Sequence, residues 1–221
     1  MMDPGEVLPK SRKLEAEGKF NEAVDLLSDA LQAEPSRGDL LLVRGRIRCE
    51  KLDQAAEAVD DFRAASELDP ASAAPHQYSS LCFLSLGDSE TAWDHACQAV
   101  DLSPDDAFSH YCYARCLTAS RRLNAAATAF QTAANLDPSL PLYQHGLIGV
   151  LIELEKYEEA ELAIVKLLHL DESPSLCIRL ARTQLAQRKA GHAIDSLKAA
   201  ASFSLSEVDQ ALVEGYRRLA N

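Results

Sequence analysis

The sequence predicts an all-α fold in which helical hairpins stack one after another. Apolar residues recur with the helical period of 3.6, and alternation with period two is nowhere sustained. Most prolines fall at the seams between hairpins or in the first turn of a helix, where a missing N–H costs little. An alanine returns once per hairpin, at separations of 35, 34, 34, 34 and 33 residues: Ala23, Ala58, Ala92, Ala126, Ala160 and Ala193. Together these three observations indicate a helical repeat protein.

Further positions repeat with the same period. Seven residues after the periodic alanine, five of the six copies carry another alanine, and the fifth copy carries Leu167. Proline closes the first four copies, at Pro35, Pro70, Pro104 and Pro138. Because a small side chain lets two helices approach to an interaxial distance of about 8 Å, the periodic alanines are predicted to lie at helix contacts.

The period places the helices in order along the chain. The predicted pairs are 6–17 with 20–33, 38–51 with 54–68, 73–86 with 89–102, 107–119 with 123–136, 141–154 with 157–170, and 175–188 with 190–203. Residues 1–5 are expected to form a flexible N-terminus. Ser206 and the acidic residues after it resemble an N-cap and predict a last helix over 206–221, which would cap the apolar end of the stack.

The second copy departs from the period. It is one residue longer than the others between Gly45 and Ala58. The sequence therefore does not determine the repeat phase of its first helix. It also does not determine the helix faces on which Arg44, Arg46 and Arg48 lie.

Two segments carry a family resemblance. "GDSETAWDHACQAVDLSP" (87–104) and "RRLNAAATAFQTAANLDP" (121–138) resemble the second half of the tetratricopeptide repeat, a helix-turn-helix unit of 34 residues. The resemblance covers six copies, near 6–37, 38–72, 73–106, 107–140, 141–173 and 174–205. It implies an all-α, right-handed superhelix with a C-terminal capping helix at 206–221.

Composition excludes several classes of protein. The 221 residues include 34 acidic and 22 basic side chains, and the resulting net charge of −12 repels phosphate backbones, so nucleic acid is not an expected partner. No apolar run approaches the roughly 18 residues of a membrane span. The first residues resemble no signal peptide, so the expected location is the cytoplasm, with the nucleus as the alternative. Six cysteines without a CxxC pair predict reduced, buried thiols and no disulfide framework.

Signatures of catalysis and metal binding are weak. No HExxH spacing, glycine-rich phosphate loop or nucleophile elbow occurs. Cys112 and Cys116 share a helix face, but two thiols fall short of the four ligands that zinc prefers. We therefore expect no enzymatic activity, no cofactor and no metal. A hydrolase with a Cys-His pair assembled across repeats stays open as a minor alternative.

The resemblance also implies where a partner binds. In tetratricopeptide-repeat proteins the first helices of successive repeats line a concave groove that holds peptides or partner helices. Mapped by the repeat phase, the candidate partner-binding residues are Arg46, Gln77, Leu81, Leu84, Phe108, Tyr111, Arg115, His145, Gly149 and Arg182. Gly146 and Gly149 are expected to admit either a ligand backbone or a neighbouring helix.

Arginine recurs at one phase of this set, and its helix neighbours differ. Arg46 has Glu50 at i, i+4, which favours a helix-surface ion pair. Arg115 and Arg182 have no acidic residue at that spacing, so they are the better candidates for contacts with a ligand. Phe108 and Tyr111 form either an anchoring wall for a partner or filling between repeats, with the two alternatives equally favoured.

We therefore expect a non-enzymatic adaptor that binds an acidic, partly apolar peptide segment of a partner protein. A structural subunit of a larger multiprotein assembly is the alternative. A co-chaperone is less favoured, because the positions that hold the carboxylate clamp in tetratricopeptide co-chaperones carry Leu8, Arg12, Val43, Ala74 and Tyr78 here.

Overall fold

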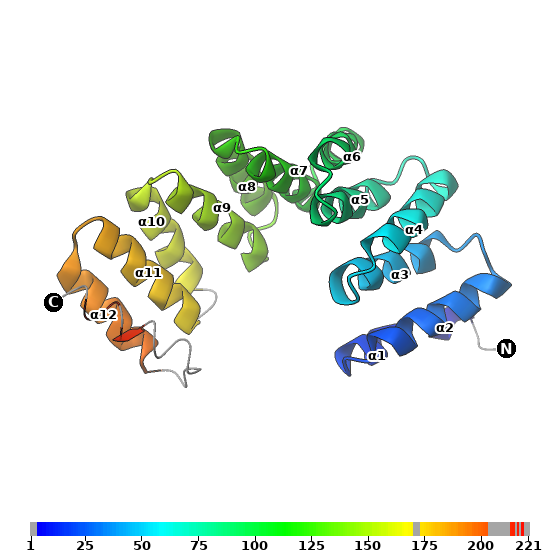
Figure 1. The fold of residues 1–221 in the computed structure, drawn as a ribbon, viewed down its shortest axis with the longest axis horizontal. Helices are drawn as coiled ribbons and strands as arrows, with labels where there is room; N and C mark the ends of the chain where they lie inside the picture. Colours follow the sequence, from blue (N-terminus) through cyan, green and yellow to red (C-terminus); the bar gives the residue numbers. More distant parts are fainter. Residues whose placement is uncertain (1–3, 170–172, 203–212, 215, 217, 219–221) are drawn as a thin grey trace. The chain divides into compact units, whose positions relative to one another are not determined.

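The computed structural model describes residues 4–169, 173–202, 213, 214, 216 and 218. Every regular element within these residues is an α-helix (Figure 1). Twelve helices have defined bounds: α1 (Pro4–Ala16), α2 (Phe20–Ala33), α3 (Gly38–Lys51), α4 (Ala55–Leu68), α5 (Ala74–Ser85), α6 (Ser89–Leu102), α7 (Ala107–Ala119), α8 (Leu123–Leu136), α9 (Pro141–Glu153), α10 (Tyr157–Leu168), α11 (Pro174–Ala186) and α12 (Ala190–Ala200). The predicted all-α class is confirmed.

The first helix begins earlier in the chain than the sequence predicts. Helix α1 begins at Pro4, inside the segment that was expected to be flexible. The predicted last helix over 206–221 lies mostly outside the described residues. Of its side chains, Val213 is buried in a cluster with α11 and α12, which includes Ala181, Ala193 and Leu197. An apolar residue from this segment therefore covers the end of the last hairpin.

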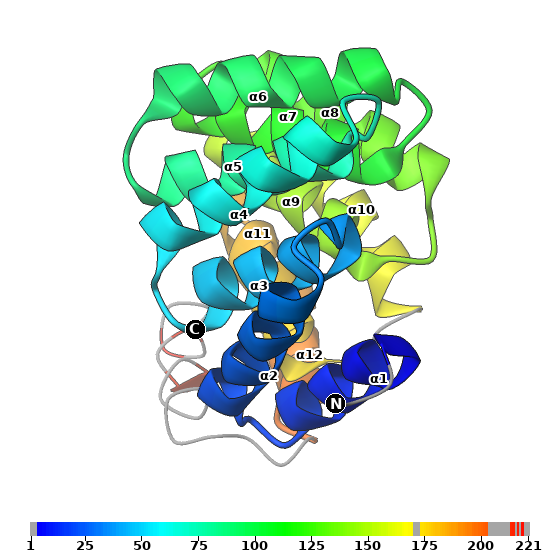
Figure 2. The same ribbon diagram turned by 90° about the vertical axis from the view of Figure 1, so that its right-hand side faces the viewer.

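The chain divides into two compact units, Met1–Arg121 and Arg122–Asn221. In the first unit each helix from α1 to α7 packs on the next, and α5 also contacts α3 and α7 (Figure 2). In the second unit α8 to α12 likewise pack in chain order. The first helices α3, α5 and α7 consequently lie side by side within the first unit.

The periodic alanines hold the hairpins together. All six of them are fully buried. A residue in the left-handed backbone region lies five positions before each of these alanines, in the turn that joins the two helices of a hairpin: Gly18, Asp53, Gly87, Arg121, Glu155 and Arg188. The tight turn brings the second helix back against the first, and the alanine provides the close approach.

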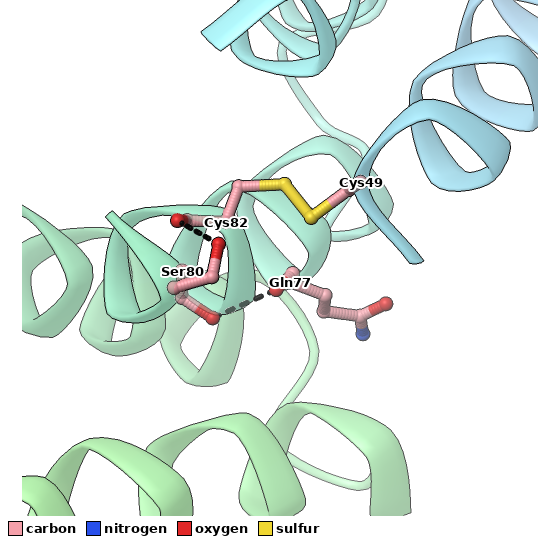
Figure 3. Close-up of a disulfide and its surroundings, with 5 residues drawn as sticks. Cys49, Gln77, Ser80 and Cys82 are labelled. Atoms are coloured by element: carbon pink, nitrogen blue, oxygen red, sulfur yellow. Dashed lines mark hydrogen bonds between the residues drawn. A yellow bond between two sulfur atoms is a disulfide. The ribbon is translucent and has the colours of Figure 1, made fainter. Parts of the chain in front are cut away.

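The structure corrects the expectation that the cysteines form no disulfide. Cys49 on α3 and Cys82 on α5 are joined, with their Cα atoms 6.1 Å apart (Figure 3). Cys82 is fully buried, and Ser80 on the same helix donates a hydrogen bond of 2.7 Å to the Gln77 carbonyl. The bond links two neighbouring hairpins across 33 positions of the sequence, a pairing that no local spacing reveals.

Thiol counting tests this bond. We expect purified protein, denatured without reductant, to show four reactive thiols out of six cysteines, and six after reduction. Peptide mapping by mass spectrometry should then find Cys49 and Cys82 in one linked species. Six reactive thiols before reduction would show that the pair is not bonded.

Candidate functional site

Aromatic side chains from α4, α5 and α7 form a row in the first unit. Phe62 stacks on Tyr78 with ring centroids 5.5 Å apart, Tyr78 meets Phe108 at 5.5 Å, and Phe108 stacks on Tyr111 at 5.7 Å. We call Phe62, Tyr78, Phe108 and Tyr111 the aromatic row. Its members come from α4, α5 and α7, so the row ties three helices together. Tyr78 and Phe108 are half-buried, whereas Phe62 and Tyr111 are buried.

Arg115 ends the aromatic row at an exposed position. Its Nη1 donates a hydrogen bond of 2.9 Å to the Tyr111 hydroxyl, and its guanidinium lies 5.8 Å from the centre of that ring. Among the described residues no carboxylate lies within ion-pair distance of Arg115. The uncharged Tyr111 side chain thus orients Arg115 without neutralising it, and the guanidinium charge can interact with a binding partner.

Arg46 lies in a different environment. Its Nη2 is 2.6 Å from Glu15 Oε2 and its Nη1 is 3.4 Å from Glu50 Oε2. The ion pair with Glu50 that its spacing indicated is present, and the stronger contact comes from Glu15 on α1. Two carboxylates of the chain already occupy this guanidinium, so Arg46 is a weaker candidate for partner binding than Arg115.

Gln77 and Leu84 make contacts within the chain. The buried Gln77 amide donates to Asp106 Oδ2 at 2.7 Å and to Ser109 Oγ at 2.8 Å. Because Asp106 also caps α7 through Ser109 N, Gln77 fastens α5 to the start of α7 instead of facing a partner. Leu84 packs on Ala92 and its neighbours, and Leu81 is half-buried.

The second unit brings His145 and Arg182 near a residue that the sequence prediction missed. Arg179 on α11 donates from Nη1 to Nδ1 of His145 on α9, at 3.3 Å. Arg179 is half-buried, and burial, followed by the nearby charge of Arg182, lowers its pKa. Among the described residues neither arginine has a carboxylate within ion-pair distance. The signal for Arg179 was its position 34 residues after His145, at the same repeat phase.

The two glycines of α9 serve different purposes. A Cβ atom on Gly146 would approach the Phe130 ring on α8 to 2.6 Å at Cδ1, so Gly146 permits close packing of a neighbouring helix. A Cβ atom on Gly149 would have its nearest neighbour, Arg179 Nη2, at 4.0 Å. Of the two explanations expected from the sequence, the neighbouring helix applies to Gly146.

The thiols of α7 are poorly suited to chemistry. Burial raises the pKa of Cys112 well above its usual range and that of Cys116 to about 12. Both thiols are therefore protonated at neutral pH, and the protonated thiol is a poor nucleophile. In the part of the chain that the structure describes, no three His, Cys, Asp or Glu side chains converge as metal ligands. Nor does any helix there have the length and apolarity needed to cross a membrane.

Comparisons with known proteins bear on the fold. No family model and no curated protein sequence matches this chain. It is similar to the crystal structure of the APC/C hetero-tetramer Cut9-Hcn1, with a TM-score of 0.79 and 16% identity over 95% of this chain and 42% of that one. It is similar to YrrB, a TPR protein with an unusual peptide-binding site, with a TM-score of 0.65 and 13% identity over 87% and 97% of the two chains. It is also similar to the crystal structure of yeast Tom70, with a TM-score of 0.71 and 20% identity over 90% of this chain and 43% of that one.

Proposed function

Since the chain has the tetratricopeptide-repeat fold, we propose that it is a non-enzymatic protein-interaction module that binds a segment of a partner protein. The observation that carries the proposal is Arg115. It is an exposed cation in a chain of net charge −12, it is oriented by Tyr111, and no carboxylate among the described residues neutralises it.

The chemistry of this face favours an acidic, partly apolar peptide. Arg115 offers a guanidinium to a carboxylate, and the half-buried Phe108 beside it offers an apolar surface. The second unit presents a comparable combination, in which Arg179 and Arg182 lie near each other and Gly149 leaves space beside Arg179. Each unit thus has a cationic position suited to an acidic side chain.

Charge reversal tests the proposal. Peptides selected from a random display library by the full chain should be rich in Asp and Glu, and their binding should be measured by fluorescence anisotropy. We expect Arg115→Glu to weaken binding at least tenfold, because a charge-assisted hydrogen bond becomes a repulsion. Raised salt should weaken wild-type binding in the same direction.

Arg63→Glu is the matched control. Arg63 is an exposed arginine on α4 that pairs with Asp60, and its side chain is 69% exposed. This variant should bind the selected peptides as the wild type does. Equal binding by Arg115→Glu and the wild type would contradict the proposed role of Arg115 on α7 in peptide binding. A second charge reversal, Arg182→Glu, measures how much the second unit contributes to peptide binding.

A structural subunit is the second candidate function. Cut9-Hcn1 is a hetero-tetramer, and this chain spans less than half of the matched chain. In addition, α10 exposes Leu162 and Val165, at 58% and 39%. Exposed apolar side chains on one helix are typical of a protein contact. Size-exclusion chromatography with light scattering separates the candidates, since a stable monomer favours the adaptor and obligate association favours the subunit.

The sequence predicts the cytoplasm, with the nucleus as the alternative, and the Cys49–Cys82 disulfide argues against both locations. A Cys49–Cys82 disulfide is of the kind that persists in oxidising compartments. The thiol state of the protein trapped directly in cells therefore tests the location: free Cys49 and Cys82 support the cytoplasm, and a bonded pair contradicts it.

A further inference from the structure

Two arginines of α11 lie close together without a counter-charge. Arg179 and Arg182 are three positions apart, so they share one face of the helix. Among the described residues no carboxylate lies within ion-pair distance of either side chain, and the neighbouring charge that acts on Arg179 is that of Arg182. Arg179 is half-buried, so water screens the repulsion between the two guanidiniums only in part. An anion bound beside them would offset this repulsion.

A histidine fixes the direction of the Arg179 side chain. Arg179 Nη1 donates a hydrogen bond of 3.3 Å to Nδ1 of His145 on α9. Because a guanidinium has no acceptor atom, Nδ1 is the acceptor in this bond, and the His145 ring is neutral with its proton on Nε2. The bond therefore orients Arg179 without adding a negative charge. The remaining N–H groups of Arg179, those of Nη2 among them, can donate to a ligand.

A glycine leaves space beside Arg179 Nη2. Within the described residues, a Cβ atom on Gly149 of α9 would have Arg179 Nη2, at 4.0 Å, as its single neighbour within that distance. Gly149 and His145 lie 34 residues after Arg115 and Tyr111, at the same repeat phase. The position that carries the Arg115 side chain in one copy thus has no side chain in the next copy. Arg179 Nη2 borders the space that results.

The number of positive charges distinguishes this site from Arg115. A single guanidinium matches the single charge and the two oxygens of a carboxylate. A phosphorylated serine or threonine carries a charge of about −1.5 to −2 at neutral pH and has three strong acceptor oxygens. Two adjacent guanidiniums match this larger charge, and each of them can donate two parallel hydrogen bonds to a phosphate. The charge on α11 therefore favours a phosphate over a carboxylate.

We propose that Arg179 and Arg182 bind the phosphate of a phosphorylated serine or threonine in the partner segment, with the phosphate in the space beside Gly149. This inference rests on the proposed peptide binding and names the class of residue that the second unit recognises. Phosphorylation of the partner then controls binding to the second unit, whereas Arg115 binds a carboxylate in either case.

Matched peptides test the proposal. The full chain should select binders from a degenerate peptide library that has phosphoserine at one fixed position. The selected peptides are then synthesised with phosphoserine, serine or glutamate at that position, and their binding is measured by fluorescence anisotropy. We expect the serine and the glutamate peptides to bind at least tenfold more weakly, because serine has no charge and glutamate has one charge and two oxygens. Selection of no phosphopeptide, or equal affinity for the phosphoserine and glutamate peptides, would overturn the proposal.

Variants of the second unit locate the phosphate. Arg179→Gln and Arg182→Gln should each weaken binding of the phosphoserine peptide at least tenfold. Gly149→Leu should also weaken it, because the new side chain fills the space beside Arg179 Nη2 while both arginines remain. Lys198→Gln is the matched control, since Lys198 is 66% exposed on α12 and pairs with Asp195. This control removes one positive charge from the same unit and should bind as the wild type does. Circular dichroism confirms that each variant is folded.

Arg115→Glu separates this inference from the proposed function. Its effect on unphosphorylated acidic peptides tests the proposed function, whereas the affinity ratio between the phosphoserine and serine peptides tests the site on α11. We expect Arg179→Gln to lower this ratio at least tenfold and Arg115→Glu to leave it unchanged. A ratio that stays at its wild-type value in Arg179→Gln would overturn the phosphate site, even where Arg115→Glu weakens the binding of acidic peptides as expected.

Discussion

Replacing Asp61 with alanine is expected to destabilise the first unit by about 3–5 kcal/mol, because it leaves two partly buried arginines without a counter-charge. The Asp61 side chain is 4% exposed. Its carboxylate accepts from Arg44 Nη2 at 2.6 Å and from Arg48 Nη1 at 2.7 Å. Urea unfolding followed by tryptophan fluorescence measures the loss, since Trp93, the single tryptophan of the chain, lies in the first unit.

Asp60→Ala is the control for this prediction. Asp60 is the adjacent carboxylate, but its pair with Arg63 is 68–69% exposed and contributes at most about 1 kcal/mol. A loss of less than 1 kcal/mol in Asp61→Ala would show that the buried network does not hold α3 to α4. Converting all three charged residues to apolar ones of similar size should recover much of the lost stability, because no buried charge is then left unpaired.

The structure places the three arginines of the second copy, whose faces the sequence left open. The phase of this copy was ambiguous because one extra residue separates Gly45 from Ala58. In the structure Arg44 and Arg48 point to Asp61 inside the hairpin, and Arg46, between them, reaches Glu15 on α1. The partners lie 13 to 31 positions away, so spacing along one helix could not reveal them.

Periodicity predicted the fold for a physical reason. Each hairpin repeats the same close contact, so the same small residue returns at each copy and the signal accumulates over six copies. The burial of all six alanines bears this out. A residue with a left-handed backbone also occurs five positions before each of these alanines. Two copies have glycine there and four have charged residues, so this repeated turn could not be recognised from residue type.

The candidate site was less predictable, because its contacts are not repeated. The repeat phase placed Phe108, Tyr111 and Arg115 on one helix, and their mutual contacts follow from that spacing. The repeat phase could not indicate that Tyr78 on α5 contacts Phe108. Nor could it indicate that Gln77, which lies at the same phase as Tyr111, donates a hydrogen bond to Asp106 within the chain. These contacts depend on which side chain each copy has at a given position. The repeat period gives the position of a residue on its helix but not the partner that its side chain contacts.

Gly45→Ala is expected to destabilise the first unit by about 2 to 3 kcal/mol through overpacking. A Cβ atom there would lie 2.6 Å from Phe62 Cε1 and 3.1 Å from Asp61 Cβ. Phe62 is fully buried and stacks on Tyr78, so a shift of its ring away from the new Cβ atom would disturb the stacking with Tyr78. The steric cost should exceed the roughly 1 kcal/mol that alanine contributes over glycine in a helix interior.

A double-mutant cycle identifies the clash as the cause. Gly38→Ala on the same helix is the control, since a Cβ atom there meets its nearest neighbour, Leu68 Cδ1, at 3.9 Å, and it should leave the urea midpoint nearly unchanged. Phe62→Leu removes the ring atoms that Cβ would meet. The variant carrying both Gly45→Ala and Phe62→Leu should therefore lose less stability than the sum of the two single changes. Simple additivity, or a Gly45→Ala variant as stable as wild type, would show that α3 and α4 do not depend on this close approach.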